Sequence, residues 1–211
     1  MIIEKIKNFF SGFERGAEAE MALDASKLKE FWTFVYDNWF DEVVDFSDVI
    51  IPRIYNPKEH FGVIVSANTS IIKVIKTVEK RLNMHVYLGA CQDKVIKNHN
   101  RPLNKNYVVI FENNIASDRW YMDLSANDLE KRGVVGITLL ERLLLEILYY
   151  QKTFNHLEGE TSTLCAGSRN ADNNTFNVFW NSDLGKVHVD VVRPSQYWHT
   201  MRTRAVIASS F

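Results

Sequence analysis

TLLERLLLEILYYQK, residues 138–152, decides the fold, because it predicts a helix that is apolar on nearly every side. Thr138 and Glu141 have the spacing of a capping box, in which each side chain accepts a hydrogen bond from the other residue's backbone N–H. A helix with so few polar positions must be covered by other elements. We therefore expect a central helix whose core side chains are almost fully buried: Leu140, Leu143, Leu144, Ile147 and Leu148.

The chain after this helix has the pattern of a small β-sheet. Strand-like segments with alternating or short apolar runs are TLCA (163–166), FNVFW (176–180), KVHVDVV (186–192) and RAVIA (204–208). Between the second and third of them lies NSDLG, with Gly185 placed for a positive backbone φ. These patterns predict a mostly antiparallel sheet with a C-terminal hairpin, in which Cys165 faces the core.

The chain before the central helix combines helices with short strands. Residues 26–44 repeat apolar side chains every three or four positions, which predicts a helix with a heavy aromatic face. We expect a second helix at 71–82, capped by Asn68 or Thr69, and a short one between Ser125 and Gly133. Further elements expected from the same rules are a helix at 1–10 and strands at 61–66, 84–89 and 106–112.

Together these elements predict an α+β fold with a helical N-terminal part, a central buried helix and a small sheet. No internal repeat or low-complexity linker interrupts the sequence, so we expect one domain over residues 1–211. The alternative is a helical part at 1–50 that packs separately from an α+β core at 59–211.

The composition is that of an ordinary globular protein, with 46% apolar and 24% charged residues. The two cysteines are too few for a disulfide framework, which favours reduced thiols. Acids occur early in the chain, and no stretch approaches the roughly 20 apolar residues that span a bilayer. We therefore expect a cytoplasmic protein without membrane contact.

The last part of the chain contains several distinctive motifs in a fixed order. TLLERLLLEILYYQKTFNHL is followed by TLCAGSRNADNN, a hairpin with a tryptophan, and MRTRAV. In this order residues 138–208 resemble a segment of uncharacterised bacterial proteins, and the resemblance implies no activity. Glycine commonly follows the aspartate in that segment, whereas Asn173 follows Asp172 here. Asn tolerates the left-handed conformation, so we expect the same turn.

The net charge of −1 conceals two oppositely charged regions. Residues 1–50 contain 11 acids and 5 Lys or Arg, while residues 68–106 contain 8 Lys or Arg and two acids. Complementary regions of this kind can steer assembly. We therefore expect a non-enzymatic binding or assembly protein that forms a homo-oligomer, with Phe9, Phe10, Asp41 and Asp45 at the interface.

The basic region offers an alternative function, because clustered cations bind nucleic-acid phosphates without any sequence motif. The residues expected to contact an anionic partner are Lys73, Lys76, Lys80, Arg81, Lys94, Lys97, Arg101 and Lys105. Salt bridges between this region and the acidic N-terminal region explain the same composition without any ligand.

A small cysteine-dependent hydrolase is the third interpretation, with Cys165 as the nucleophile beside His188 and Asp190. Phosphate-binding glycine motifs, the GxSxG elbow and zinc motifs are absent from the sequence. Asp37, Asp41 and Asp45 recur on one predicted helix face, a pattern typical of hard-cation sites and also of solvated acidic faces. We expect no catalytic site, no metal and no cofactor.

Overall fold

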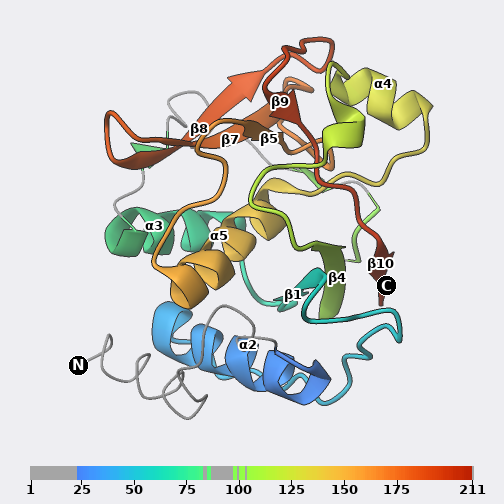
Figure 1. Ribbon diagram of the computed structural model, residues 1–211. Helices are drawn as coiled ribbons and strands as arrows, with labels where there is room; N and C mark the ends of the chain where they lie inside the picture. Colours follow the sequence, from blue (N-terminus) through green and yellow to red (C-terminus); the bar gives the residue numbers. More distant parts are fainter. Residues whose placement is uncertain (1–22, 83–84, 87–96, 99, 103, 211) are drawn as a thin grey trace.

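The computed structural model describes residues 23–82, 85–86, 97–98, 100–102 and 104–210 (Figure 1). The helices are α2 (Ala25–Phe40), α3 (Ile71–Leu82), the 3-10 turn η1 (Arg119–Tyr121), α4 (Ala126–Lys131) and α5 (Leu139–Thr153). The strands are β1 (His60–Val65), β2 (His85–Val86), β3 (Lys97–Asn98), β4 (Tyr107–Glu112), β5 (Ser162–Leu164), β6 (Ser168–Arg169), β7 (Thr175–Asn181), β8 (Lys186–Val192), β9 (Met201–Arg202) and β10 (Ala208–Ser209). The α+β prediction is confirmed. The helix expected at 1–10 lies outside the described residues.

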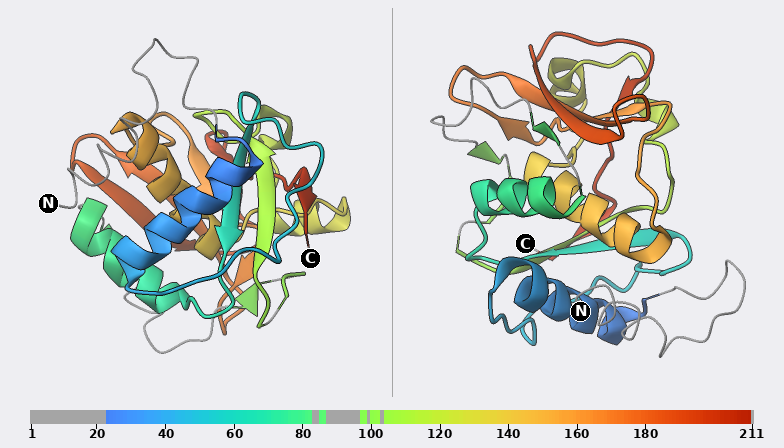
Figure 2. Two further views of the ribbon diagram at one scale, coloured as in Figure 1. Left: turned by 90° about the horizontal axis from the view of Figure 1, so that it is seen from below. Right: turned by 90° about the vertical axis from the view of Figure 1, so that its left-hand side faces the viewer.

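Helix α5 lies at the centre of the molecule. In Figures 1 and 2, α5 and α3 form a layer between the β7–β8 sheet on one side and β1, β4 and α2 on the other. All five leucine and isoleucine side chains expected in the core are buried. The capping box is also present, with Thr138 Oγ1 accepting from the Glu141 N–H and Glu141 accepting from the Thr138 N–H. The prediction of a central buried helix is therefore confirmed.

The larger sheet is built around the predicted hairpin. Within the described residues it has five strands in the order β2-β8-β7-β5-β9. β7 and β8 pair antiparallel from Thr175↔Val192 to Asn181↔Lys186, while the two outermost pairings are parallel. Gly185 has the expected positive φ of 59°, and Asn173 takes the left-handed conformation with φ 64°. β10 joins the other sheet, whose order is β1-β4-β10.

Helix α2 covers the free edge of β1. The Trp32 indole N–H donates to the Gly62 carbonyl at 3.0 Å, and the Tyr36 hydroxyl donates to the Ile64 carbonyl at 3.2 Å. The Ser66 N–H in turn donates to the Tyr36 hydroxyl at 3.0 Å. The aromatic face of α2 therefore supplies both apolar cover and hydrogen bonds to backbone groups that an uncovered edge strand leaves unpaired. Residues of α2 and α5 belong to the same hydrophobic cluster.

The structure corrects the expected acidic helix face. α2 ends at Phe40, where Asp41 takes a left-handed φ of 51°, so Asp45 lies beyond the helix and does not share a face with Asp37. The Asp41 N–H donates to the Tyr36 carbonyl as the C-cap of the helix. Val43, which the sequence placed on the apolar helix face, is 95% exposed beyond the helix end.

The N-terminus of α3 also differs from the prediction. The Ser70 hydroxyl accepts a hydrogen bond from the Lys73 N–H at 3.2 Å, so Ser70 is the capping side chain in place of Asn68 or Thr69. Thr69 instead donates to Glu42 at 2.6 Å. None of the described helices is long and apolar enough to cross a membrane.

Candidate functional site

Arg101, an expected ligand of an anionic partner, is used inside the chain. Its guanidinium forms an ion pair with Glu141, and the side chain of Arg101 is 2% exposed. It also donates to the Gly136 carbonyl at 3.1 Å, and the Tyr107 hydroxyl donates to the same carboxylate at 3.1 Å. Arg101 therefore holds the segment before β4 against the start of α5, and the expectation of a surface ligand is wrong for this residue.

Two further members of the basic region are also engaged within the chain. Lys73 forms an ion pair with Glu42 at 2.7 Å. Arg81 donates to the Asn38 carbonyl at 2.9 Å, and its guanidinium lies 5.3 Å from the centre of the Trp39 ring. Cations on the surface are Lys76, Lys80, Lys97 and Lys105, whereas Lys94 lies outside the described residues. The basic region thus offers a partner less charge than its composition indicates.

Cys165, His188 and Asp190 do not form a catalytic group. Cys165 is fully buried in the cluster next to α5, as expected, and burial raises the pKa of its thiol above the ordinary range. Because neighbours along a strand point to opposite faces, His188 lies on the other face of the sheet from Val187 and Val189, which share the cluster of Cys165. The His188 ring stacks on its cross-strand neighbour Phe179, with centroids 5.4 Å apart.

Of the four expected interface residues, Phe9 and Phe10 lie outside the described residues. Asp41 and Asp45 are both on the surface. A hydrogen bond from the Ser47 N–H to the Asp45 carboxylate, 2.8 Å long, lowers the pKa of Asp45. In the part of the chain that the structure describes, no group of three or more His, Cys, Asp or Glu is placed to hold a metal ion.

A buried polar network, absent from the sequence-based expectations, has Glu158 at its centre. This carboxylate accepts hydrogen bonds from Ser117, Thr161 and Thr163, and it forms an ion pair with Arg204 in which neither side chain is exposed. Burial is the largest single influence on the pKa of Glu158 and raises it, but the charges of Arg204 and Arg142 together with the hydrogen bonds from Thr161 and Thr163 outweigh burial, so the net pKa is lowered. Glu158 is therefore a satisfied, ionised group in the interior.

The same network extends to α5. Arg142 donates to Thr163 at 3.1 Å and to Glu146 at 2.6 Å, and both charged side chains are fully buried. Glu146 also meets His156 at 2.8 Å. Because the charges are enclosed and paired, the network joins α5 to β5 and does not present a reactive group to solvent.

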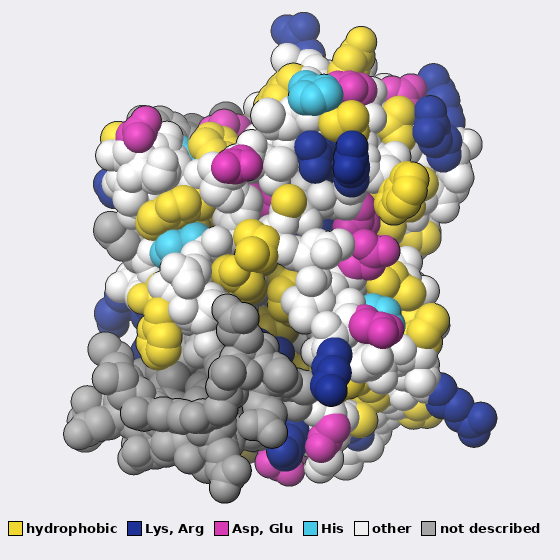
Figure 3. All heavy atoms as spheres, viewed as in Figure 1, with side chains coloured by type: hydrophobic (Ala, Val, Ile, Leu, Met, Phe, Trp, Pro, Cys, Tyr) yellow, Lys and Arg dark blue, Asp and Glu magenta, His cyan; other side chains and the backbone are white. Residues whose placement is uncertain are grey.

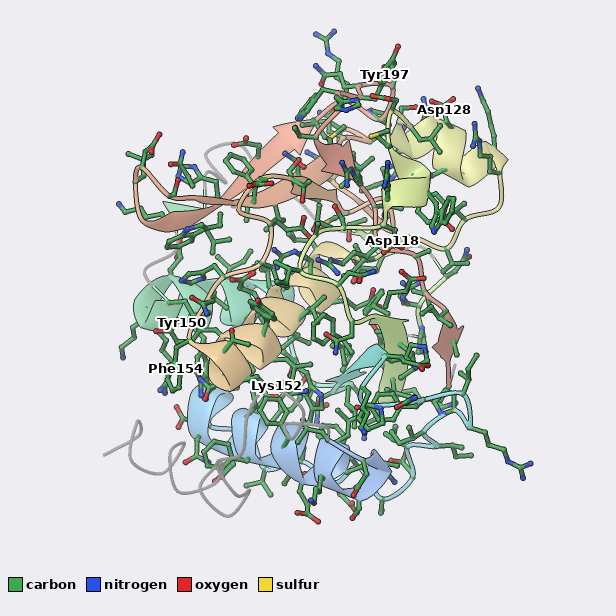
Figure 4. The ribbon with its side chains drawn as sticks, in the orientation of Figure 1. Asp118, Asp128, Tyr150, Lys152, Phe154 and Tyr197 are labelled. Atoms are coloured by element: carbon green, nitrogen blue, oxygen red, sulfur yellow. The ribbon has the colours of Figure 1, made fainter. Side chains whose placement is uncertain are left out.

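The end of α5 carries a set of aromatic contacts. The His156 ring stacks on Trp180 at 3.8 Å, and Tyr150 contacts both His156 and the exposed Phe154. Burial lowers the pKa of neighbouring Lys152 to about 8 (Figure 4). Among the described residues Lys152 forms no hydrogen bond or ion pair, so this pKa is its only unusual feature.

Arg204 holds the loop that leads into η1. Its guanidinium donates to the backbone carbonyls of Asn114 and Ile115, both at 2.8 Å. The Asp118 carboxylate accepts from the Ala205 N–H at 2.7 Å, and the Asp118 N–H donates to the Thr203 carbonyl at 3.1 Å. The η1 turn is therefore held in place by the buried side chains of Arg204 and Asp118.

Three exposed aromatic side chains lie on η1 and on the loop 193–200. Trp120 is 84% exposed, Tyr197 58% and Trp198 38%. We define the aromatic–arginine surface as Arg119, Trp120, Tyr121, Arg193, Tyr197 and Trp198. Figure 1 shows the loop 193–200, between β8 and β9, at the same end of the molecule as α4, and Figure 4 places Tyr197 and Asp128 there.

One side-chain contact and one backbone hydrogen bond join the two halves of this surface. Asp123, just after η1, meets His199 at 3.4 Å, and the Asn127 N–H donates to the Pro194 carbonyl at 3.0 Å. In Figure 3, Lys or Arg, acidic, His and hydrophobic side chains occur together over this end of the molecule. The segments 119–127 and 193–200 thus form one continuous surface region.

The charges around the aromatic–arginine surface are unevenly engaged. Asp123 pairs with His199, and the Asp128 carboxylate accepts from Ser125, whose hydrogen bonds lower the pKa of Asp128. Among the residues that the structure describes, the side chains of Arg119 and Arg193 form no hydrogen bond or ion pair. The arginine charges are therefore free to meet an anion, while the neighbouring acids are occupied.

The signal for this surface in the sequence is weak. RWY (119–121) and QYW (196–198) place aromatic residues without helical or strand periodicity in polar surroundings, next to arginines. No family model, no curated protein and no solved structure matches this chain, so the resemblance of residues 138–208 stays a prediction.

Proposed function

We propose that the protein is a non-enzymatic binding protein whose partner contacts the aromatic–arginine surface. The observation that carries the proposal is the exposure of Trp120, at 84%, on a turn that is anchored from the interior. Tryptophan, tyrosine and arginine are the side chains that most often dominate binding energy when a partner covers them. Here they occur together on two adjoining segments.

The reactive groups of the interior support a binding function over catalysis. The Cys165 thiol is buried with a raised pKa, which disfavours the thiolate that a nucleophile needs. The ion pairs of Arg142 with Glu146 and of Arg204 with Glu158 are enclosed on all sides. A substrate reaches none of these groups without a local opening of the fold.

Self-association through oppositely charged regions stays a prediction, but its expected residues are partly engaged elsewhere. Lys73 pairs with Glu42 and Arg101 with Glu141 in the same chain, which lowers the charge available for a second copy. The aromatic–arginine surface keeps its positive side chains available, because Arg119 and Arg193 form no ion pair with any described residue. A second copy of the chain is therefore one class of partner for this surface.

Native mass spectrometry of the full chain tests the proposal, at low and at moderate salt, with and without a mixed-sequence oligonucleotide. We expect a species heavier than the monomer for the wild type, and its loss in the variant Trp120→Ser, Tyr197→Ser, Trp198→Ser. The matched control replaces exposed residues elsewhere, Ile50→Ser with Leu184→Ser, and should keep the heavier species. Retention of that species by the aromatic variant, or a wild type that is monomeric in every condition, refutes the proposal.

A further inference from the structure

We infer that the partner of the aromatic–arginine surface is a single-stranded nucleic acid, an inference that rests on the function proposed above. The surface combines aromatic planes with unpaired guanidinium groups, and each component matches one component of such a ligand. Bases stack on aromatic side chains, and phosphates are neutralised by arginine.

The aromatic side chains suit a ligand with exposed flat rings. η1 and the loop 193–200 expose three large hydrophobic side chains, and all three are aromatic: Trp120, Tyr197 and Trp198. Exposed aliphatic side chains lie on the flanking segments, Ile115 at 61% before η1, and Val135 and Ile207 at 37% each. Protein interfaces are also rich in these side chains, so the aromatic rings alone allow either partner, and a stacking surface for bases requires nothing more than the rings.

A single strand fits this surface better than a duplex. The bases of a duplex are stacked on one another and hidden from a flat side chain, so a duplex offers the surface mainly phosphates. The unstacked bases of a single strand are free to lie on Trp120 and on the 197–198 pair. Each such contact contributes about 1–3 kcal/mol on alanine substitution in known single-strand-binding proteins.

Two guanidinium groups of the surface are available to phosphates. Arg119 and Arg193 flank the aromatic side chains in sequence, and in the described part of the chain neither takes part in an ion pair. The nearby carboxylates are engaged, Asp123 with His199 and Asp128 with Ser125. A phosphate backbone therefore meets two uncommitted guanidinium groups without displacing any existing ion pair.

The surface is held in place before any ligand arrives. Arg193 and Gln196 exchange two hydrogen bonds, of 2.7 Å and 2.9 Å, which close the turn at the start of the loop. The Met201 N–H donates to the Trp198 carbonyl at 2.9 Å. η1 is anchored by a hydrogen bond from the Ala205 N–H to the carboxylate of Asp118, the residue before η1. Because these segments are ordered already, binding loses less conformational freedom.

Fluorescence anisotropy of the full chain with labelled probes of about 12 nucleotides tests the inference, since binding sites of this class cover several nucleotides. The probes are a mixed-sequence single-stranded DNA, the matching RNA and the DNA duplex, with inorganic polyphosphate as a competitor. We expect tighter binding to either single strand than to the duplex, and weak competition by polyphosphate. Trp120→Ala should weaken single-strand binding by about 5- to 150-fold.

Two variants with the same loss of charge locate the phosphate contacts. Arg119→Gln with Arg193→Gln should reduce the slope of log affinity against log salt by about 0.7 for each lost contact. Lys76→Gln with Lys80→Gln, on the basic face of α3, should leave both affinity and slope unchanged. If the lysine variant loses affinity and slope while the arginine variant keeps both, the site lies on residues 73–105 and the inference is overturned.

The outcomes separate this inference from the proposed function. Equal affinity for duplex or polyphosphate overturns a single-strand ligand. A heavier species in native mass spectrometry without any oligonucleotide binding, lost in the aromatic variant, leaves the proposed function standing with a second copy as partner. A chain that neither binds a probe at low salt nor forms a heavier species refutes both.

Discussion

Asp118 provides the sharpest test of how the interior supports η1. Its side chain is buried, and its Oδ2 accepts the Ala205 N–H. Among the described residues its Oδ1 has no hydrogen-bond partner. Burial raises the pKa of Asp118 to about 6 from an ordinary value of 3.8, even though Ala205 and Arg204 act in the opposite direction. The folded protein therefore holds this proton more tightly than the unfolded chain does.

The sign and size of the effect on stability follow from this difference in pKa. Between about pH 4 and pH 6 folding takes up a proton at Asp118, so the free energy of unfolding falls as the pH rises. A difference of 6 − 3.8, or about 2.2 pKa units, corresponds to about 3 kcal/mol in full and to about 2–3 kcal/mol between pH 4 and pH 7. This contribution to stability is present at low pH and lost above about pH 6.

Asp118→Asn removes the titration while keeping an oxygen that accepts from Ala205. The amide also buries a donor that needs a partner, so the absolute stability of the variant is a poor measure of the effect. We expect instead that the stability of the variant relative to wild type, from urea unfolding, rises by about 2–3 kcal/mol between pH 4 and pH 7. The other titrating groups are common to both proteins, so their contributions largely cancel in the difference between the two stabilities.

Asp128→Asn is the matched control, because hydrogen bonds from Ser125 lower the pKa of Asp128. Its stability relative to wild type should fall, not rise, as the pH increases through the acid range. A difference curve for Asp118→Asn that is flat between pH 4 and pH 7, or that slopes like that of Asp128→Asn, refutes the account of a carboxylate held in an unfavourable buried position.

Three further predictions concern the core. Leu144→Ala should lower the free energy of unfolding in urea by about 2–5 kcal/mol, because this side chain is fully buried in the central helix; a loss below about 1 kcal/mol contradicts that packing. Tyr36→Phe should cost about 1–3 kcal/mol in the same assay, since it leaves the Ile64 carbonyl and the Ser66 N–H without their hydrogen bonds; an unchanged stability contradicts the edge-covering role. In a variant that retains Cys165 as its only cysteine, a thiol reagent should label the native protein no faster than the protein opens. Rapid labelling is the contrary result.

Local patterns predicted the elements of the fold because the relevant interactions lie within a few residues. The capping box at Thr138 and Glu141, the cap at Ser125 and the positive φ at Gly185 are set by neighbours in the sequence. The buried α5 followed from the same logic, since an all-round apolar helix is covered by whatever surrounds it. Which elements cover it depends on strand order, and periodicity carries no information about that order.

The ion-pair partners of the charged side chains could not be predicted from the sequence. Arg101 lies in a basic, polar segment that is typical of solvent exposure, yet its guanidinium pairs with Glu141 in the interior. The spacing of Arg142 and Glu146 is also that of an exposed ion pair on a helix, although both are buried. Each case depends on residues that are distant along the chain, such as Tyr107 and Thr163.

The aromatic–arginine surface was missed for a related reason. Trp120 and Tyr197 belong to short turns with no periodic pattern, and neither turn by itself forms a site. They adjoin because β9 pairs in parallel with β5, which returns the chain beside the loop that carries η1. The site is therefore formed by the topology of the fold, and each of its two segments is inconspicuous when the sequence is considered alone.

The choice of a buried ion pair beneath this surface has a physical reason. Burying Arg204 with Glu158 costs desolvation that two apolar residues of similar volume do not incur, so added stability is a weak explanation. An apolar side chain, however, cannot bond to the carbonyls of Asn114 and Ile115, whereas a guanidinium has five donors in a fixed plane. One arginine therefore satisfies Glu158 and fixes the loop before η1 at the same time. The position of Trp120 depends on this geometry, which links a fully buried ion pair to the aromatic side chain that is most exposed among the described residues.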